Sequence, residues 1–367
     1  MKVLLTGVGA AGNKAVVNAV EEGIVNIEDT IIINSTSKDF PPNYNGKKIV
    51  LSGNDTGCGK ERSIAKEYAQ NAMSQGKFNL DNMSEYATIV VVTSVEGGTG
   101  SGSAPIIAKM FNKVYNKNVH IIAFTGFEED VRGLSNTVEF FKEIDSSLIV
   151  QTISNASFLQ KAGGNKLRAE ELANKAMTER ISVITGQDFI ASEQNIDDTD
   201  ILKLTNTMGY MTVEKKFIKN PLETREDFDK VIKNMIYNSS SVKIDKPFAT
   251  RLGVVLNISP ASEDAVDFTF TNLKAAYGSP YEFFLQHQWD GKQEYIAYIA
   301  SGMKMPLEEI QAIYDRYIEQ TSKINKDSDE FFATMQGMNT LEEDSKFNMI
   351  RNTERGMSIT DFLSDNS

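Results

Sequence analysis

The feature that most constrains this chain of 367 residues is a glycine-rich string in its first third. Residues 96–105 read EGGTGSGSAP, and they follow an apolar run at 88–92 that is typical of a buried strand. A helical pattern comes next, so the string predicts either a strand–loop–helix phosphate site or a plain flexible turn. Glycines let backbone amides approach a polyphosphate, and a helix N-terminus adds partial positive charge. The candidate phosphate-binding residues are Gly97, Gly98, Thr99, Gly100 and Ser101.

A second glycine string, GVGAAG at residues 7–12, follows the first apolar run of the chain. It matches the dinucleotide fingerprint G-x-G-x-x-G, which is a weak signal when it stands alone. That fingerprint is completed by an acidic residue at the end of the second strand, where this chain has Asn34, Ser35 and Thr36. An NAD(P)-dependent oxidoreductase is therefore the alternative from another class, and it leaves the string at 96–105 unexplained.

A third string, GNDTGCGK at residues 53–60, is superficially a Walker A loop. Five residues separate Gly53 from the Gly59-Lys60 pair where the motif requires four, and Glu61 replaces the hydroxyl residue that would bind Mg²⁺. The string is therefore not a Walker A loop. Gly57 and Gly59 belong either to another kind of phosphate loop or to a surface turn.

Short apolar runs alternate with helical patterns through the first half, which predicts an α/β fold with a parallel sheet buried on both faces. The runs are at residues 3–5, 30–33, 48–51, 88–93 and 119–124. A long helical pattern at 164–190 would reach about 38 Å and could bridge two domains. Further strands are expected at 251–258, 266–270 and 293–300, and then a helix with Leu307, Ile310, Tyr314 and Tyr317 on one side. Beyond about residue 319 the pattern weakens, so we expect a loosely attached tail.

These strings, in this order, resemble the nucleotide loops of the tubulin/FtsZ superfamily. The resemblance implies a parallel, Rossmann-like GTP-binding sheet, a long central helix, a second, smaller α+β domain, and a C-terminal helix and tail. We expect a GTP-binding domain at 1–163, the central helix at 164–190, a second, GTPase-activating domain at 191–318, and the C-terminal helix and tail at 319–367. The resemblance is motif by motif up to about residue 212 and only in outline beyond it.

The resemblance also implies roles for residues outside the first string. Those expected near the phosphates and base are Gly9, Ala10, Ala11, Asn13, Lys14, Gly57 and Gly59. Those expected near the sugar, phosphates and guanine are Glu128, Arg132, Asn155 and Glu170. The Glu170 carboxylate could accept hydrogen bonds from N1–H and N2–H₂ of guanine but not from N1 of adenine, or it is an exposed helix carboxylate. The chain departs from the family in having Ala10 and Ala11 in place of glycines, Glu170 in place of Asn or Asp, and Lys166 in place of a stacking Phe.

Residues 195–200, NIDDTD, match the N-x-D-x-x-D loop of the family at Asn195, Asp197 and Asp200. Two carboxylates three residues apart at the start of a helix share one face and can polarise a water molecule for attack on phosphorus. Without the resemblance, a helix cap would be the simpler interpretation. The resemblance implies that this loop completes the GTP site of the next subunit, so that GTP and Mg²⁺ drive a head-to-tail filament and hydrolysis to GDP weakens it.

The formal net charge of −12 disfavours direct binding to DNA, because phosphate binding requires a basic face. A single cysteine excludes a disulfide framework, and no apolar stretch approaches the roughly 20 residues that span a bilayer. The N-terminus has none of the features of a signal peptide. We therefore expect a cytoplasmic protein that binds neither nucleic acid nor membrane directly.

The acidic, proline-free C-terminus and the departures above favour the TubZ-like branch, which segregates plasmid or phage DNA. An FtsZ-like cell-division protein and a non-hydrolysing filament remain alternatives. Ile359, Phe362 and Leu363 have the i, i+3, i+4 spacing of a short helix that binds a groove, with Arg351 and Arg355 upstream. We expect this tail either to bind a DNA-bound adaptor protein or to pack on its own or a neighbouring subunit.

Overall fold

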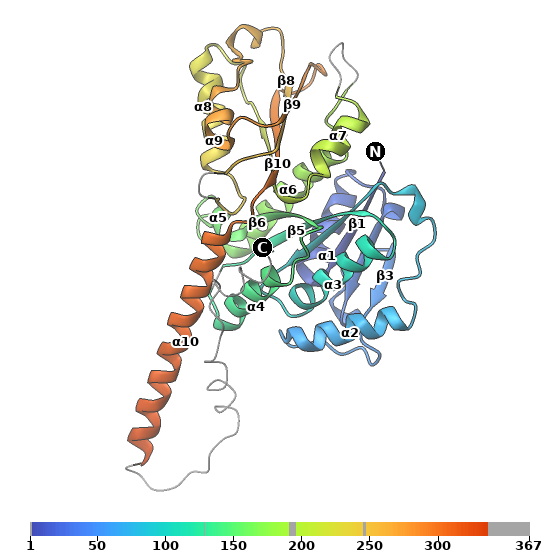
Figure 1. Cartoon of the computed structure of the whole chain (residues 1–367), viewed down its shortest axis with the longest axis vertical. Helices are drawn as coiled ribbons and strands as arrows, with labels where there is room; N and C mark the ends of the chain where they lie inside the picture. The colour runs from blue at the N-terminus through green and yellow to red at the C-terminus, as the bar shows by residue number, and fades with distance from the viewer. Residues whose placement is uncertain (1, 128, 191–195, 245–246, 337–367) are drawn as a thin grey trace.

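The computed structural model describes residues 2–127, 129–190, 196–244 and 247–336, with the last ten described by their helical backbone alone. In this part of the chain, ten strands form one sheet in the order β3-β2-β1-β4-β5-β6-β7-β10-β8-β9 (Figure 1). The strands are β1 Val3–Val8, β2 Thr30–Asn34, β3 Lys47–Val50, β4 Thr88–Ser94, β5 Asn118–Thr125, β6 Ile149–Ser154, β7 Gly209–Phe217, β8 Arg251–Asn257, β9 Glu282–Gln288 and β10 Tyr295–Met303.

The first seven strands of this order are parallel, from β3 through β7. β10 then pairs antiparallel with both β7 and β8, and β9 joins the edge parallel to β8. Every residue of β1 and β2 is buried, which explains why their sequences read as continuous apolar runs. The predicted α/β fold with a parallel sheet is confirmed, and β6, β7 and β9 are additional to the strands that the runs predicted.

The helices cover both faces of the sheet. They are α1 Gly9–Glu21, α2 Arg62–Ser74, α3 Thr99–Lys113, α4 Val131–Lys142, α5 Asn155–Leu159, α6 Lys166–Ile184, α7 Asp198–Thr205, α8 Arg225–Tyr237, α9 Thr271–Tyr277 and α10 Leu307–Gln336. α1 and α6 pack on one face of the parallel strands and share a core cluster with them. α2 and α3 pack on the other face, against a larger cluster. Among the helices in the described residues, none combines the length and apolar character that crossing a membrane requires.

The long helix expected at 164–190 is α6, which has 19 residues and ends at Ile184. Its end is set by a Schellman motif, in which Gly186 has φ +82° and Gln187 N donates to Ser182 O. At about 1.5 Å per residue the helix is ~28 Å long, shorter than expected. It still connects two cores, because Met177 packs with α1 whereas Ile184 packs with β7, β8 and β10.

The prediction of a strand at 266–270 is wrong. This segment is a turn between a 3₁₀ helix, η4 Glu263–Ala265, and α9. The Asp267 carboxylate accepts a hydrogen bond from Thr269 N at 3.0 Å, and Phe270 has φ +51°. Val266 and Phe270 are buried while Phe268 is 44% exposed. Their alternating burial therefore comes from a side-chain-stabilised turn and not from the pleat of a strand.

α10 runs on to Gln336, although the apolar pattern weakens near residue 319. Ile313 packs with Leu134 and Val138 of α4, and this contact anchors the first half of the helix. The second half extends past the rest of the described fold (Figure 1). The predicted partner-binding tail lies outside the described residues.

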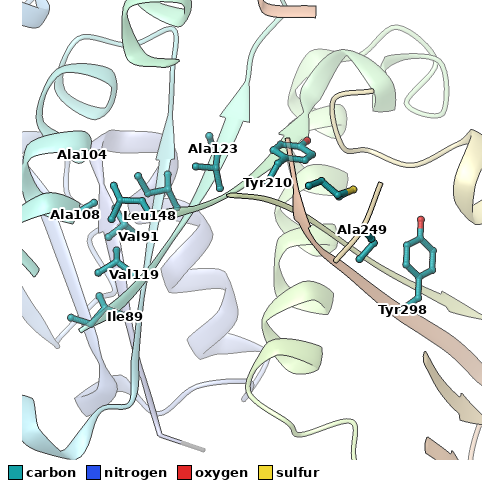
Figure 2. Packing of buried hydrophobic residues seen from close by; sticks show 14 of the residues in the cluster. Ile89, Val91, Ala104, Ala108, Val119, Ala123, Leu148, Tyr210, Ala249 and Tyr298 are labelled. Atoms are coloured by element: carbon teal, nitrogen blue, oxygen red, sulfur yellow. The ribbon is translucent and has the colours of Figure 1, made fainter. Parts of the chain in front are cut away.

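One apolar cluster runs through both parts of the sheet. Figure 2 shows Ile89 and Val119 of the parallel strands at one end of this cluster, and Ala249 and Tyr298 at the other. Tyr210 of β7 lies between these two groups (Figure 2). The two parts therefore share a core, and the domain boundaries expected from the sequence remain a prediction.

Candidate nucleotide-binding site

A cavity of about 320 Å³ lies where β1, β2 and β4 end. The carboxyl ends of parallel strands are the usual place for a ligand in an open α/β sheet. The residues predicted to bind nucleotide that line this cavity are Gly9, Ala10, Ala11, Gly57, Gly59, Gly97, Gly98, Thr99 and Gly100. All three glycine strings of the sequence therefore meet at one site.

Thr99, the first residue of α3, joins three of the surrounding segments. Its hydroxyl lies 2.9 Å from Ser35 Oγ, just after β2, and 3.1 Å from Cys58 Sγ in the third glycine string. The first backbone bond of α3 joins Gly102 N to Gly98 O at 2.9 Å, so the preceding amides are available at the helix start. Ser101 does not line the cavity, and its hydroxyl donates to Gly97 O.

The glycines of the site fall into two groups. A Cβ on Gly98 would lie 2.6 Å from Lys60 Cα, and a Cβ on Gly100 would lie 2.7 Å from Ser94 O, so packing requires glycine at both positions. A Cβ on Gly57 or Gly97 would meet no described atom within 4 Å, although both residues line the cavity. Packing within the chain therefore gives no reason for glycine at 57 or 97, whereas the close approach of a phosphate would.

Asp39 is the only carboxylate among the described residues that line the cavity, and it was not predicted from the sequence. It ends a short 3₁₀ helix, η2 Ser37–Asp39, five residues beyond β2. Mg²⁺ is usually held by one or two carboxylates together with phosphate oxygens and waters. In the described part of the chain, no group of three His, Cys, Asp or Glu side chains could hold a metal. The site therefore fits magnesium that binds with a nucleotide, through Asp39 and the nearby hydroxyls of Ser35 and Thr99.

Asn13 and Lys14 do not line the cavity. Asn13 is fully buried: its Oδ1 accepts from Ile33 N at 3.2 Å and its Nδ2 donates to Ile33 O at 3.1 Å. This pair of bonds fixes α1 to β2. Lys14 is exposed on α1. The sequence could not show which of these polar side chains faces a neighbouring strand.

Arg132 forms an ion pair with Glu61 at 2.8 Å and does not line the cavity. Next to it, Lys60 pairs with Asp130 at 3.0 Å, and Asp130 also caps α4 by accepting from Gly133 N. The two pairs join the third glycine string to the start of α4. All four side chains are about half exposed, so each pair contributes little to stability by itself. Glu128 lies outside the described residues.

Asn155 and Glu170 lie apart from the cavity, at the starts of α5 and α6. The Oδ1 atom of Asn155 is buried and accepts no hydrogen bond from the described residues. A buried acceptor of this kind normally has a partner, and a sugar hydroxyl would provide one. Glu170 is half-buried. Lys166, which stands in place of the stacking Phe of the family, pairs with Glu129 and lies 5.7 Å from the centre of the Phe127 ring.

Asp197 caps α7, as the simpler interpretation of the sequence predicted. Its Oδ1 accepts from Asp200 N at 2.9 Å, and Asp200 pairs with Lys203 at 3.3 Å. Asp197 is exposed and Asp200 is half-buried, so both carboxylates are within reach of solvent. Asn195 lies outside the described residues.

α7 and the cavity lie at opposite ends of the parallel strands. α7 leads into β7, which runs parallel to β6, so the end of α7 lies where these strands begin. There, Thr205 and Asn206 lie against His120, near the start of β5. Figure 1 shows α7 beside the N-terminus, whereas the cavity lies where β1 ends. The six residues of β1 alone span about 20 Å, so the carboxylates of α7 do not reach the cavity of the same chain.

The fold and this cavity define a nucleotide-binding α/β protein with a separate acidic surface at the other end of its sheet. Residues 2–163 match the family model described as "Tubulin/FtsZ family, GTPase domain". Residues 2–163 are therefore similar to the GTPase domain of the tubulin/FtsZ family, whose members bind GTP and GDP. The expected resemblance is confirmed.

Relatives and solved structures extend the match beyond this domain. The cell-division protein FtsZ of Methanothermobacter thermautotrophicus is 23% identical over 272 residues, which are 71% of this chain and 67% of that protein. TubZ of Clostridium botulinum phage c-st has 19% identity and a TM-score of 0.67, covering 88% of this chain and 98% of that one. CetZ2 of Haloferax volcanii has 17% identity and a TM-score of 0.71, covering 88% and 100%. The whole chain thus has the tubulin/FtsZ fold.

Proposed function

We propose that this protein is a filament-forming GTPase whose hydrolytic site is completed by the next subunit. The observation that carries the proposal is the separation of the glycine-lined cavity from Asp197 and Asp200. In a head-to-tail contact, the α7 of one copy covers the cavity of the next. Such an interface is heterologous and does not close on itself, so it generates a filament.

In the composite site, the two subunits have different tasks. The amides of the glycine strings and the start of α3 hold the phosphates, and Asp39 would help to hold Mg²⁺, which would supply positive charge against the phosphates. Asp197 and Asp200 of the neighbouring copy accept hydrogen bonds from the attacking water and orient it in line with the γ-phosphate. Lys203 holds the Asp200 carboxylate in place through their ion pair.

Solved structures of similar fold support assembly. CetZ2 of Haloferax volcanii is described as a GTPγS-bound protofilament, and TubZ of Bacillus thuringiensis as a GTPγS-form protofilament. The Bacillus protein is 16% identical to this chain with a TM-score of 0.70. A protofilament requires one end of a subunit to contact the opposite end of the next, and the cavity and α7 lie at opposite ends of the parallel strands.

The first test is Asp200→Ala, which removes a carboxylate without touching the cavity. GTP turnover is expected to fall ~100- to 10,000-fold, with GTP affinity within about twofold of wild type. Mixing the Asp200→Ala protein with Thr99→Ala, which has a damaged cavity but an intact α7, should restore part of the turnover, because the intact cavity of one variant can meet the intact α7 of the other. Steady-state phosphate release measures both effects. Turnover per molecule that stays constant from nanomolar to micromolar protein would rule out a site shared between subunits.

We further propose that the filament works in the cytoplasm and moves plasmid or phage DNA through an adaptor protein bound to the C-terminal tail. The net charge of −12 and the similarity to a phage TubZ support this role. FtsZ-like cell division remains the second candidate, because curated FtsZ proteins are 23–26% identical to this chain. A chain truncated after Gln336 should assemble and hydrolyse GTP but lose the adaptor–DNA complex in a co-sedimentation assay. Normal recruitment of DNA by the truncated chain would exclude the tail as the adaptor site.

A further inference from the structure

Two glutamines on β9 face the segment that leads into α7. Gln286 and Gln288 are two residues apart, so their side chains lie on the same face of the strand. Their residues are 0% and 5% exposed. Fully buried side-chain amides need hydrogen-bond partners, and both find them on the backbone of Asp188, Ile190 and Ile196.

Gln286 joins two points of this segment with a single amide group. Its Nε2 donates to Ile190 O at 2.9 Å, and its Oε1 accepts from Ile196 N at 2.7 Å. Ile196 is buried and immediately precedes Asp197, the cap of α7. The planar amide therefore fixes the backbone one residue before the first carboxylate of the acidic helix.

Gln288 anchors the segment upstream. Its Oε1 accepts from Ile190 N at 2.9 Å and its Nε2 donates to Asp188 O at 2.6 Å. Tyr295 OH donates to the same Asp188 carbonyl at 2.8 Å, and the buried Lys215 pairs with the Asp188 carboxylate at 2.5 Å. Residues 188–190 are thus held against β9 and β10 by side chains in place of a backbone ladder.

We propose that Gln286 is a positioning residue for GTP hydrolysis, which sets the direction in which α7 presents Asp197 and Asp200 to the neighbouring subunit. This inference rests on the proposed function above. Gln286 is fully buried, so it acts through the backbone of Ile196. A displacement of about 1 Å in a catalytic group can cost ~100-fold in rate, so the loss of this bond should affect hydrolysis far more than nucleotide binding.

The experiment uses the full-length chain with Gln286→Leu, which removes the hydrogen bonds to Ile190 and Ile196 at similar side-chain volume. We expect GTP turnover to fall about 10- to 100-fold, with GTPγS affinity within about twofold of wild type and pelletable polymer retained. Gln288→Leu, whose bonds lie farther from Asp197, should lower turnover less. The matched control is Leu285→Ala, on the same strand but packed on the opposite face of the sheet. It should lower the melting temperature and leave turnover within about twofold of wild type.

Wild-type turnover in Gln286→Leu overturns the inference. So does an equal loss of turnover in Leu285→Ala at the same melting temperature, because the effect would then be one of general stability. If Gln286→Leu does not fold, Gln286→Asn takes its place, since the shorter amide cannot reach Ile190 and Ile196 together. Intermediate turnover with normal GTPγS binding supports the inference, and wild-type turnover overturns it. The GTP turnover of Asp200→Ala is measured in parallel. If Asp200→Ala is fully active, the proposed function fails. If Asp200→Ala is inactive and Gln286→Leu is fully active, only the positioning role of Gln286 is rejected.

Discussion

The two ends of the parallel strands are built from different chemistry. Where the strands end, three glycine strings and the hydroxyl of Thr99 surround a cavity whose described lining contains one carboxylate, Asp39. Where the strands begin, Asp197 and Asp198 at the start of α7 are exposed and Asp200 is half-buried. One end suits an anionic ligand and the other suits a water molecule that must be polarised. Under the proposed function, each end supplies one part of the hydrolytic site.

Charge repulsion gives a physical reason for this separation. Two like charges 4 Å apart near a protein surface repel by about 4 kcal/mol, so carboxylates placed beside the γ-phosphate would oppose nucleotide binding. Keeping them on the far end of the sheet lets GTP bind to a free subunit. In the proposed filament, the carboxylates would meet the phosphate only at the interface between subunits, whose contacts would compensate for the repulsion.

The largest expected effect comes from Gly98→Val at the cavity end. Its side chain would collide with the backbone of Lys60, whose Cα lies 2.6 Å from the position of a Cβ. We expect loss of measurable GTP binding and, as a consequence, of all assembly. The matched variant is Gly97→Ala, whose Cβ meets no described atom within 4 Å. If Gly97→Ala keeps a melting temperature near that of wild type but binds a fluorescent GTP analogue more weakly, Gly97 faces the phosphates. Wild-type binding of the analogue by Gly98→Val would refute the placement of the site.

A smaller effect is expected from Glu170→Ala, which tests base recognition at the same end. If the carboxylate accepts hydrogen bonds from guanine, its loss should lower the preference for GTP over ATP by about 10- to 100-fold, the usual worth of a bidentate contact to a base. Competition between labelled GTP and unlabelled ATP measures this preference. Unchanged selectivity would leave Glu170 as a half-buried helix carboxylate. Glu171→Ala, one residue along α6, is the control.

Arg132→Ala should weaken GTP binding by about tenfold if the guanidinium leaves Glu61 to contact a phosphate, because a charge-assisted hydrogen bond is worth ~1.5–3 kcal/mol. Glu61→Ala separates the two possible roles of the pair. It frees Arg132, so GTP affinity should be unchanged or higher. Equal weakening by both variants would show instead that the pair serves to hold the third glycine string against α4. Isothermal titration with GTPγS decides between these outcomes.

The effect expected to change GTP turnover least concerns His120, at the end of the sheet near α7. Burial lowers the pKa of His120 to about 4, from an ordinary value near 6.5. The unfolded chain therefore binds a proton between pH 6.5 and 4 that the folded chain does not, and stability falls over this window as pH decreases, by about 3 kcal/mol. Between pH 7 and 4.5, the melting temperature of wild type should fall more than that of His120→Gln. Parallel curves for the two proteins would contradict the assignment.

The sequence predicted the structure best where a sequence pattern has only one structural explanation. The buried parallel strands appear as continuous apolar runs because both of their faces are covered, and the glycine strings meet at one cavity. It failed at 266–270, where a turn held by Asp267 produces the burial pattern of a strand. The cavity lining by Asp39 and Cys58 was missed, because which loop residues meet depends on the spacing of strand ends.

The sequence by itself determined the fold class, the order of the glycine strings and the placing of Asp197 and Asp200 three residues apart at the start of one helix. Only the tertiary structure decided which end of the sheet each group occupies. A loop that follows a parallel strand lies at one edge of the sheet, and a helix that leads into such a strand ends at the other, so strand direction separates α7 from the glycine loops. The same holds for Gln286. Nothing in the sequence distinguishes this glutamine from others, and its hydrogen bond with Ile196 exists only because the fold brings β9 next to that residue.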